Sequence, residues 1–120
     1  MGTRGELPQV DAAISTVQAG ADAYVVSVSG ELDLYSTPPL VAELEALAPA
    51  APGVVLDLDA VSFIDSTGLG AILLSIRRLR EAGGNMVIVC SNESTRRLLT
   101  LVGLDRVAPI FDTSAALEQP

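Results

Sequence analysis

Short apolar runs of strand length alternate along this chain with longer segments of helical periodicity, and this alternation limits the folds it can adopt. The runs at residues 24–28, 54–58 and 85–90 are rich in valine, isoleucine and leucine, which is typical of buried strands. Helical segments are predicted at residues 37–48, 67–81 and 93–102. Strands that alternate with helices in this way predict right-handed crossovers and a mainly parallel sheet.

Weaker signals extend the sheet at both ends. Rough apolar alternation over residues 10–18, followed by a turn at residues 20–22, predicts an antiparallel hairpin with the strand at residues 24–28. A short strand is expected at residues 107–111, and residues 113–117 are expected to add a helical turn.

The length of 120 residues fits one domain. We therefore predict a single α/β domain over residues 10–120, with a mixed, mostly parallel sheet of four to five strands, behind a flexible tail at residues 1–9. Hydrophobic residues make up 49% of the chain and aromatic residues only 3%, so the core must be built from aliphatic side chains.

Local signals predict where the elements begin and end. Thr37 is held extended by the following Pro38 and is expected to cap the first helix. That helix should turn a stripe of leucines to the core: Leu40, Leu44 and Leu47. Residues 59–65 are expected to connect the strand at residues 54–58 to the second helix.

The charge balance excludes several kinds of partner. The formal net charge is -8, so nucleic acid and anionic membrane surfaces would be repelled on average. The chain has no histidine and a single cysteine, Cys90, which we expect to be a small core residue. We therefore expect no metal, no cofactor and no disulfide framework, and a cytoplasmic location, because residues 1–9 lack a signal pattern.

The segment at residues 62–70 joins a buried strand to a helix, a place where α/β domains often carry sites. Asp65, Ser66 and Thr67 crowd three capping-type side chains where one is needed, and Ser66 is expected at the N-cap. Gly68 and Gly70 lower helix propensity in the first turn, which suggests the close approach of another group. From these residues alone, a simple cap followed by a tight turn explains the pattern at least as well.

The helix that follows has two predicted faces. A core face is expected to hold Leu69, Ile72, Leu73, Ile76, Leu79 and the stem of Arg80. The opposite face is expected to hold Thr67, Gly70, Ala71, Leu74, Arg78 and Glu81. Small residues around an exposed Leu74 form a surface that can accept side chains of another protein.

Phosphorylation of Ser66 would have a definite physical effect. The helix dipole and free backbone N–H groups would tolerate the added charge in the free domain, so the fold should survive. In a complex, the same charge would be desolvated against the partner, at a cost of several kcal/mol. The modification would therefore switch binding off without unfolding the domain.

At these residues the chain resembles the STAS domains, specifically the bacterial anti-sigma factor antagonists, from about residue 10 to residue 117. The resemblance rests on Gly-Glu-Leu-Asp at residues 30–33, Val-Leu-Asp-Leu at residues 55–58 and Phe-Ile-Asp-Ser-Thr-Gly-Leu-Gly at residues 63–70. It extends to the glycine pair before the strand at residues 86–89 and to Leu-Val-Gly-Leu at residues 101–104. It implies a sheet with helices packed mainly on one side.

The resemblance also implies a switch in transcription regulation, as in bacterial stress responses. The unphosphorylated form would bind an anti-sigma factor, which is itself a Ser/Thr kinase, and so release the sigma factor. The kinase would inactivate the chain by phosphorylating Ser66, and a protein phosphatase would restore it. Asp33 would lie near the site, Asp65 and Thr67 would flank the acceptor, and Thr67 leaves the acceptor assignment open. The partner surface would therefore comprise Asp33, Asp65, Thr67, Gly68, Gly70, Leu74 and Arg78.

Other functions remain as alternatives: a STAS module that binds a nucleotide, or one that docks in a membrane transport complex. Catalysis is disfavoured, because Ile64 replaces the first glycine of a nucleophile elbow and no histidine can complete a triad. The carboxylates of Asp57, Asp59 and Asp65 lack metal-ligand spacing.

Overall fold

The computed structural model describes residues 13–50 and 52–112, which contain a five-stranded sheet with three α-helices. The strands are β2 (Ala13–Gly20), β3 (Ala23–Leu32), β4 (Gly53–Ile64), β5 (Asn85–Val89) and β6 (Ile110–Phe111). The helices are α1 (Thr37–Leu47), α2 (Ser66–Glu81) and α3 (Glu93–Leu101), with 3-10 turns at Ala48–Ala50 and Leu104–Arg106. The expected tail at residues 1–9, the start of the first strand at residues 10–12 and the terminal turn at residues 113–117 lie outside the described residues.

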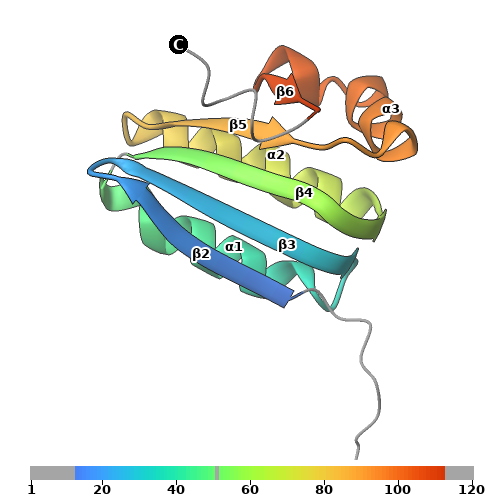
Figure 1. The fold of residues 1–120 in the computed structure, drawn as a ribbon, viewed down its shortest axis with the longest axis horizontal. Helices are drawn as coiled ribbons and strands as arrows, with labels where there is room; N and C mark the ends of the chain where they lie inside the picture. Colours follow the sequence, from blue (N-terminus) through green and yellow to red (C-terminus); the bar gives the residue numbers. More distant parts are fainter. Residues whose placement is uncertain (1–12, 51, 113–120) are drawn as a thin grey trace, which may run out of the picture.

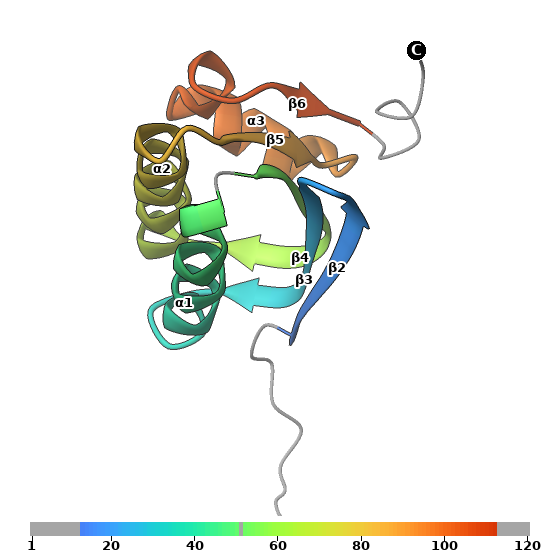
Figure 2. The same cartoon turned by 90° about the vertical axis from the view of Figure 1, so that its left-hand side faces the viewer.

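The strands lie in the order β2-β3-β4-β5-β6. The first two form the predicted antiparallel hairpin, and every later pair is parallel. Both α1 and α2 cover the same face of the sheet, as Figures 1 and 2 show, and in the described part of the chain the opposite face of β2, β3 and β4 carries no helix. This arrangement confirms the predicted α/β fold and its mostly parallel sheet.

The core between the helices and the sheet is almost entirely aliphatic, as the composition required. On α1 the stripe is confirmed, because Leu40 and Leu44 are buried and Leu47 is partly buried against the core. Cys90 is also buried in this cluster, and burial raises the pKa of its thiol, which fits the expected packing role.

The strand β4 continues to Ile64, so the prediction of a connection from residue 59 was wrong. Its buried residues change spacing from two to three at Leu58, Val61 and Ile64. Two register shifts in the pairing with β3, the second next to Gly30 at φ 93, let the longer strand stay paired. Strands are recognised by the strict alternation of buried and exposed residues, and this alternation is broken where β4 shifts its register against β3.

Element ends differ in smaller ways. The N-cap of α1 is Ser36 rather than Thr37, which is the first helical residue, and β3 runs on to Leu32. The last strand begins only at Ile110, after the 3-10 turn that follows Gly103 at φ 84.

No helix within the described residues has the length and hydropathy needed to cross a bilayer.

Candidate functional site

Ser66 is the first residue of α2, directly after β4, and its side chain is exposed. The N-cap is Asp65 and not Ser66, which corrects the sequence prediction. The backbone of Asp65 is extended, and its Oδ1 accepts a hydrogen bond from the N–H of Gly68 at 3.0 Å. Asp65 performs the capping, and Ser66 is exposed with no side-chain hydrogen bond to another described residue.

The loop after β3 lies beside this helix start. Residues Leu32 and Ile64 are register partners at the ends of the parallel strands β3 and β4. The N–H of Asp65 donates to the carbonyl oxygen of Leu32 at 3.1 Å. Asp33 and Ser66 are therefore brought to the same edge of the sheet.

The carboxylate of Asp33 is engaged within its own loop. It accepts the backbone N–H groups of Ser36 and Tyr35, each at 3.0 Å. The hydrogen bond from the Ser36 backbone is the largest of the influences that hold the pKa of Asp33 below its ordinary value. The charged form of this side chain therefore stabilises the turn that follows β3.

Gly68 and Gly70 differ in what surrounds them. A methyl group at Gly68 would lie 2.9 Å from Cγ1 of Ile64 and 3.0 Å from the carbonyl oxygen of Leu32. Gly68 is buried, so the close approach suggested by the sequence at this position is to the protein's own strands. A methyl group at Gly70 would meet no atom within 4 Å, and this residue is exposed.

Exchanging each glycine for alanine should have opposite effects on stability. Gly70→Ala is expected to raise the free energy of unfolding by about 1 kcal/mol, because alanine favours the helix and the space is open. Gly68→Ala is expected to lower it by about 1–2 kcal/mol, because the methyl group pushes α2 away from β3 and β4. Urea denaturation measures both changes. The same sign for both variants would contradict the packing described for the first turn of α2.

The exposed face of α2 matches the predicted face closely. Thr67 is exposed, Leu74 keeps 43% of its surface, and Arg78 forms an ion pair with Glu45 of α1. Ala71 is partly buried, in contrast to its predicted exposure. The exposed residues Thr67, Gly70, Leu74 and Arg78 thus form a surface that starts beside Ser66 and runs along α2.

A shallow hollow of about 210 Å³ lies beside Ser66, between α2 and the end of α3. Its lining is mostly apolar: Ser66, Leu69, Gly70, Leu73, Val102 and Leu104. Leu73, predicted on the core face, is partly buried against the core and also borders this hollow. The contributions of Val102 and Leu104 were not predicted, because they depend on how α3 packs beside α2.

Further large apolar side chains are exposed around the same edge. Leu34 and Tyr35 follow β3, and Phe63 lies near the end of β4, with exposed fractions of 60%, 81% and 50%. Leu34 and Tyr35 carried no prediction, whereas Phe63 belongs to the motif at residues 63–70 and its exposure was not predicted. The sequence could have indicated them in one way: each is an apolar residue that follows the end of a strand or interrupts the alternation of buried and exposed residues in a strand.

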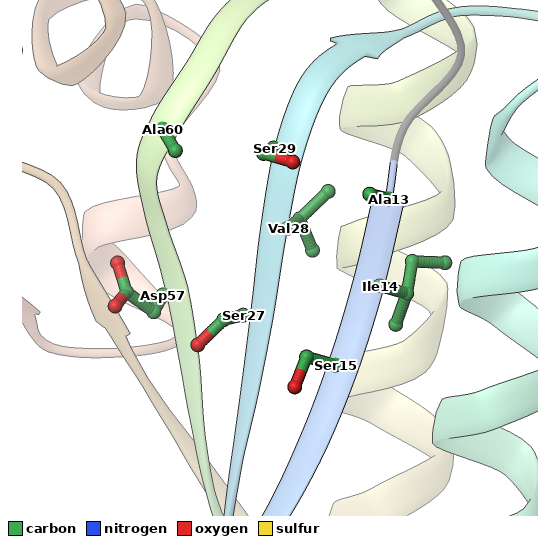
Figure 3. A pocket seen from close by; sticks show the side chains of 8 residues that line it. All are labelled: Ala13, Ile14, Ser15, Ser27, Val28, Ser29, Asp57 and Ala60. Carbon is green, nitrogen blue, oxygen red and sulfur yellow. The ribbon is translucent and has the colours of Figure 1, made fainter.

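A second hollow of about 190 Å³ lies on the uncovered face of the sheet, and Figure 3 shows its lining. Most of its lining side chains are small, and Asp57 is the charged one among them. Neither this hollow nor the one beside Ser66 is lined by a basic side chain. The geometry therefore gives no support to the nucleotide alternative, since neither hollow offers an arginine or lysine to pair with a phosphate.

Comparison with known proteins finds a matching family model and similar sequences. A family model described as STAS domain matches residues 13–117. The anti-sigma-B factor antagonist of Bacillus subtilis is 34% identical over 93 residues, which cover 78% of this chain and 83% of that relative.

Solved structures agree with this match. An anti-sigma factor antagonist from Mycobacterium paratuberculosis has a TM-score of 0.75 and 33% identity, over 87% of this chain and 90% of that protein. SpoIIAA, an anti-sigma factor antagonist, has a TM-score of 0.74 in its unphosphorylated form, at 20% identity over 88% of this chain and 94% of its own. The phosphorylated form of SpoIIAA has a TM-score of 0.69, at 19% identity over 88% of this chain and 97% of its own. Both forms therefore share the fold of this chain.

Proposed function

The chain belongs to the STAS domain family, and from this premise we propose that it is an anti-sigma factor antagonist switched by phosphorylation of Ser66. Unphosphorylated, the chain binds an anti-sigma factor and frees the sigma factor for transcription. Its relatives support the proposal, because a Bacillus subtilis relative and a solved Mycobacterium paratuberculosis protein carry the name anti-sigma factor antagonist.

The observation that carries the proposal is the position of the Ser66 hydroxyl. It is exposed at the first turn of α2, where the capping is already performed by Asp65. A kinase can reach this hydroxyl without opening the domain. The first N–H groups of the helix and the positive end of its dipole then face the added phosphoryl group, so the free domain tolerates the charge.

The docking face begins at this serine. It comprises Thr67, Gly70, Leu74 and Arg78 along α2, together with Asp65 at the cap. Gly68 supports this face from inside, because its small size lets the first turn of α2 lie close to β3 and β4. A doubly charged group at Ser66 would have to be desolvated against the partner, and this lowers affinity.

The partners follow from the same proposal. The anti-sigma factor is a Ser/Thr kinase that uses ATP to modify Ser66, and a protein phosphatase reverses the modification. The chain acts by binding rather than by catalysis, and it acts in the cytoplasm, where the sigma factor and its regulators meet.

Phosphoryl transfer to Ser66 provides the direct test. The chain is incubated with ATP and each purified anti-sigma factor kinase of its source organism, and intact-mass measurement with peptide mapping locates the modification. One kinase, the cognate kinase, is expected to add a single phosphoryl group to the wild-type chain and to Thr67→Ala, and none to Ser66→Ala. Modification of Ser66→Ala at Thr67, with Thr67→Ala left unmodified, would reassign the acceptor. No modification of the wild-type chain by any of these kinases would refute the proposal.

A further inference from the structure

Two large apolar side chains stand in solvent directly after β3. Tyr35 keeps 81% of its surface exposed, more than any other large apolar residue among those described, and its neighbour Leu34 keeps 60%. Single exposed apolar residues are common on protein surfaces. Two consecutive ones in a short turn call for an explanation when that turn is held rigid.

Hydrogen bonds hold the turn at both ends. The carboxylate of Asp33 accepts the N–H groups of Tyr35 and Ser36 at 3.0 Å. The hydroxyl of Ser36, a buried residue, accepts the N–H of Asp33 at 2.9 Å and donates to the carbonyl oxygen of Glu31. The N–H of Thr37 then donates to the Asp33 carbonyl oxygen at 3.0 Å and starts α1. The backbone between β3 and α1 is thus fixed while its two apolar side chains point outward.

The same turn adjoins the phosphorylation site. The carbonyl oxygen of Leu32, one residue before Asp33, accepts the N–H of Asp65, one residue before Ser66. Gly68 packs against Leu32 from the helix side. A partner that covers Ser66 therefore meets the turn at residues 33–36 as part of one continuous surface.

We propose that Leu34 and Tyr35 form an apolar anchor that enters an apolar pocket of the anti-sigma factor, and that Asp33 is the positioning residue that holds this anchor. The inference rests on the proposed function, whose docking face it extends from α2 to the turn after β3. A tyrosine presented on a rigid turn loses little conformational freedom on binding, and buried tyrosines are frequent among residues that dominate interface energies. Asp33 acts through the turn rather than through a charge contact with the partner.

Truncation of the anchor gives the first test. Binding of the purified cognate kinase, with ADP in place of ATP, is measured by calorimetry for Leu34→Ala, Tyr35→Ala and the wild-type chain. Each variant is expected to bind about tenfold more weakly or worse, with unchanged stability in urea. Val17→Ala is the matched control, because Val17 is 59% exposed on β2, away from the Ser66 edge, and this variant should bind like the wild type.

Substitution of Asp33 separates positioning from direct contact. The amide oxygen of Asp33→Asn can still accept the two N–H groups, so this variant should keep slow hydrogen exchange at Tyr35 and Ser36 and bind within about threefold of wild type. Asp33→Ala should lose this protection and bind about tenfold more weakly. An Asp33→Asn variant that keeps the protection yet binds as poorly as Asp33→Ala would show a direct charge contact and overturn the positioning role.

The outcomes distinguish this inference from the proposed function. If Ser66→Asp weakens binding while Leu34→Ala and Tyr35→Ala bind like the wild type, the anchor is refuted and the phosphorylation switch stands. If the wild-type chain binds none of the anti-sigma factors, the proposed function fails, and the anchor fails with it.

Discussion

The Ser66→Asp variant is expected to bind the cognate kinase at least about a hundredfold more weakly than the wild-type chain. The exposed hydroxyl at the start of α2 would be replaced by a charge that must lose its water when the partner docks. A loss of about 3 kcal/mol corresponds to this factor, and it lies at the lower end of the cost of an unpaired buried charge. Calorimetry in the presence of ADP measures the affinity directly.

Stability separates this effect from damage to the fold. The helix dipole favours a carboxylate in the first turn, so Ser66→Asp should unfold at the same or a slightly higher urea concentration than the wild type. Ser66→Ala should bind like the unphosphorylated wild type, and ATP should no longer weaken its binding. Equal affinities of the wild-type chain and both variants would refute control of binding by phosphorylation of Ser66.

Two substitutions on α2 are expected to have different effects: Ile72→Ala should lower the stability of the domain, and Leu74→Ala should weaken its binding. Ile72 is fully buried in the core, whereas Leu74 keeps 43% of its surface exposed on the other side of α2. Ile72→Ala should lower the free energy of unfolding by about 3 kcal/mol, since it leaves a cavity between α2 and the sheet. Leu74→Ala should change that free energy by less than about 1 kcal/mol but weaken binding of the cognate kinase about tenfold.

Two measurements on each variant complete this test. Urea denaturation gives the stability, and calorimetry at a temperature where both variants are folded gives the affinity. Ile72→Ala should bind within about threefold of the wild type once folded. A Leu74→Ala variant that binds as tightly as the wild type would exclude this part of α2 from the docking face.

The order of elements was predictable because each strand and helix carries its own local composition. Residues 54–58 are apolar enough to predict a strand without any partner, and the leucine stripe of α1 fixes its buried face. The end of β4 was not predictable in this way. Its buried residues fall at every third position there, because the pairing with β3 includes two register shifts, and a register shift belongs to the pair of strands rather than to one sequence.

The candidate site was predicted in outline but not in detail. Three adjacent residues, Asp65, Ser66 and Thr67, can all cap a helix, and only the extended backbone of Asp65 decides between them. The hollow beside Ser66 needs α3 to pack next to α2, so no local pattern reveals that Val102 borders it. Likewise, Tyr35 acquires its exposed position from hydrogen bonds to Asp33 that form only when β3 ends and α1 begins.

The central claim is that one phosphoryl group on Ser66 controls docking. The chain is phosphorylated to completion by its cognate kinase, purified, and divided into two portions, one of which is treated with a phosphatase. Calorimetry with fresh kinase and ADP should give an affinity about a thousandfold lower for the phosphorylated portion, with the same far-ultraviolet circular dichroism for both portions. Equal affinities for the two portions would contradict the account.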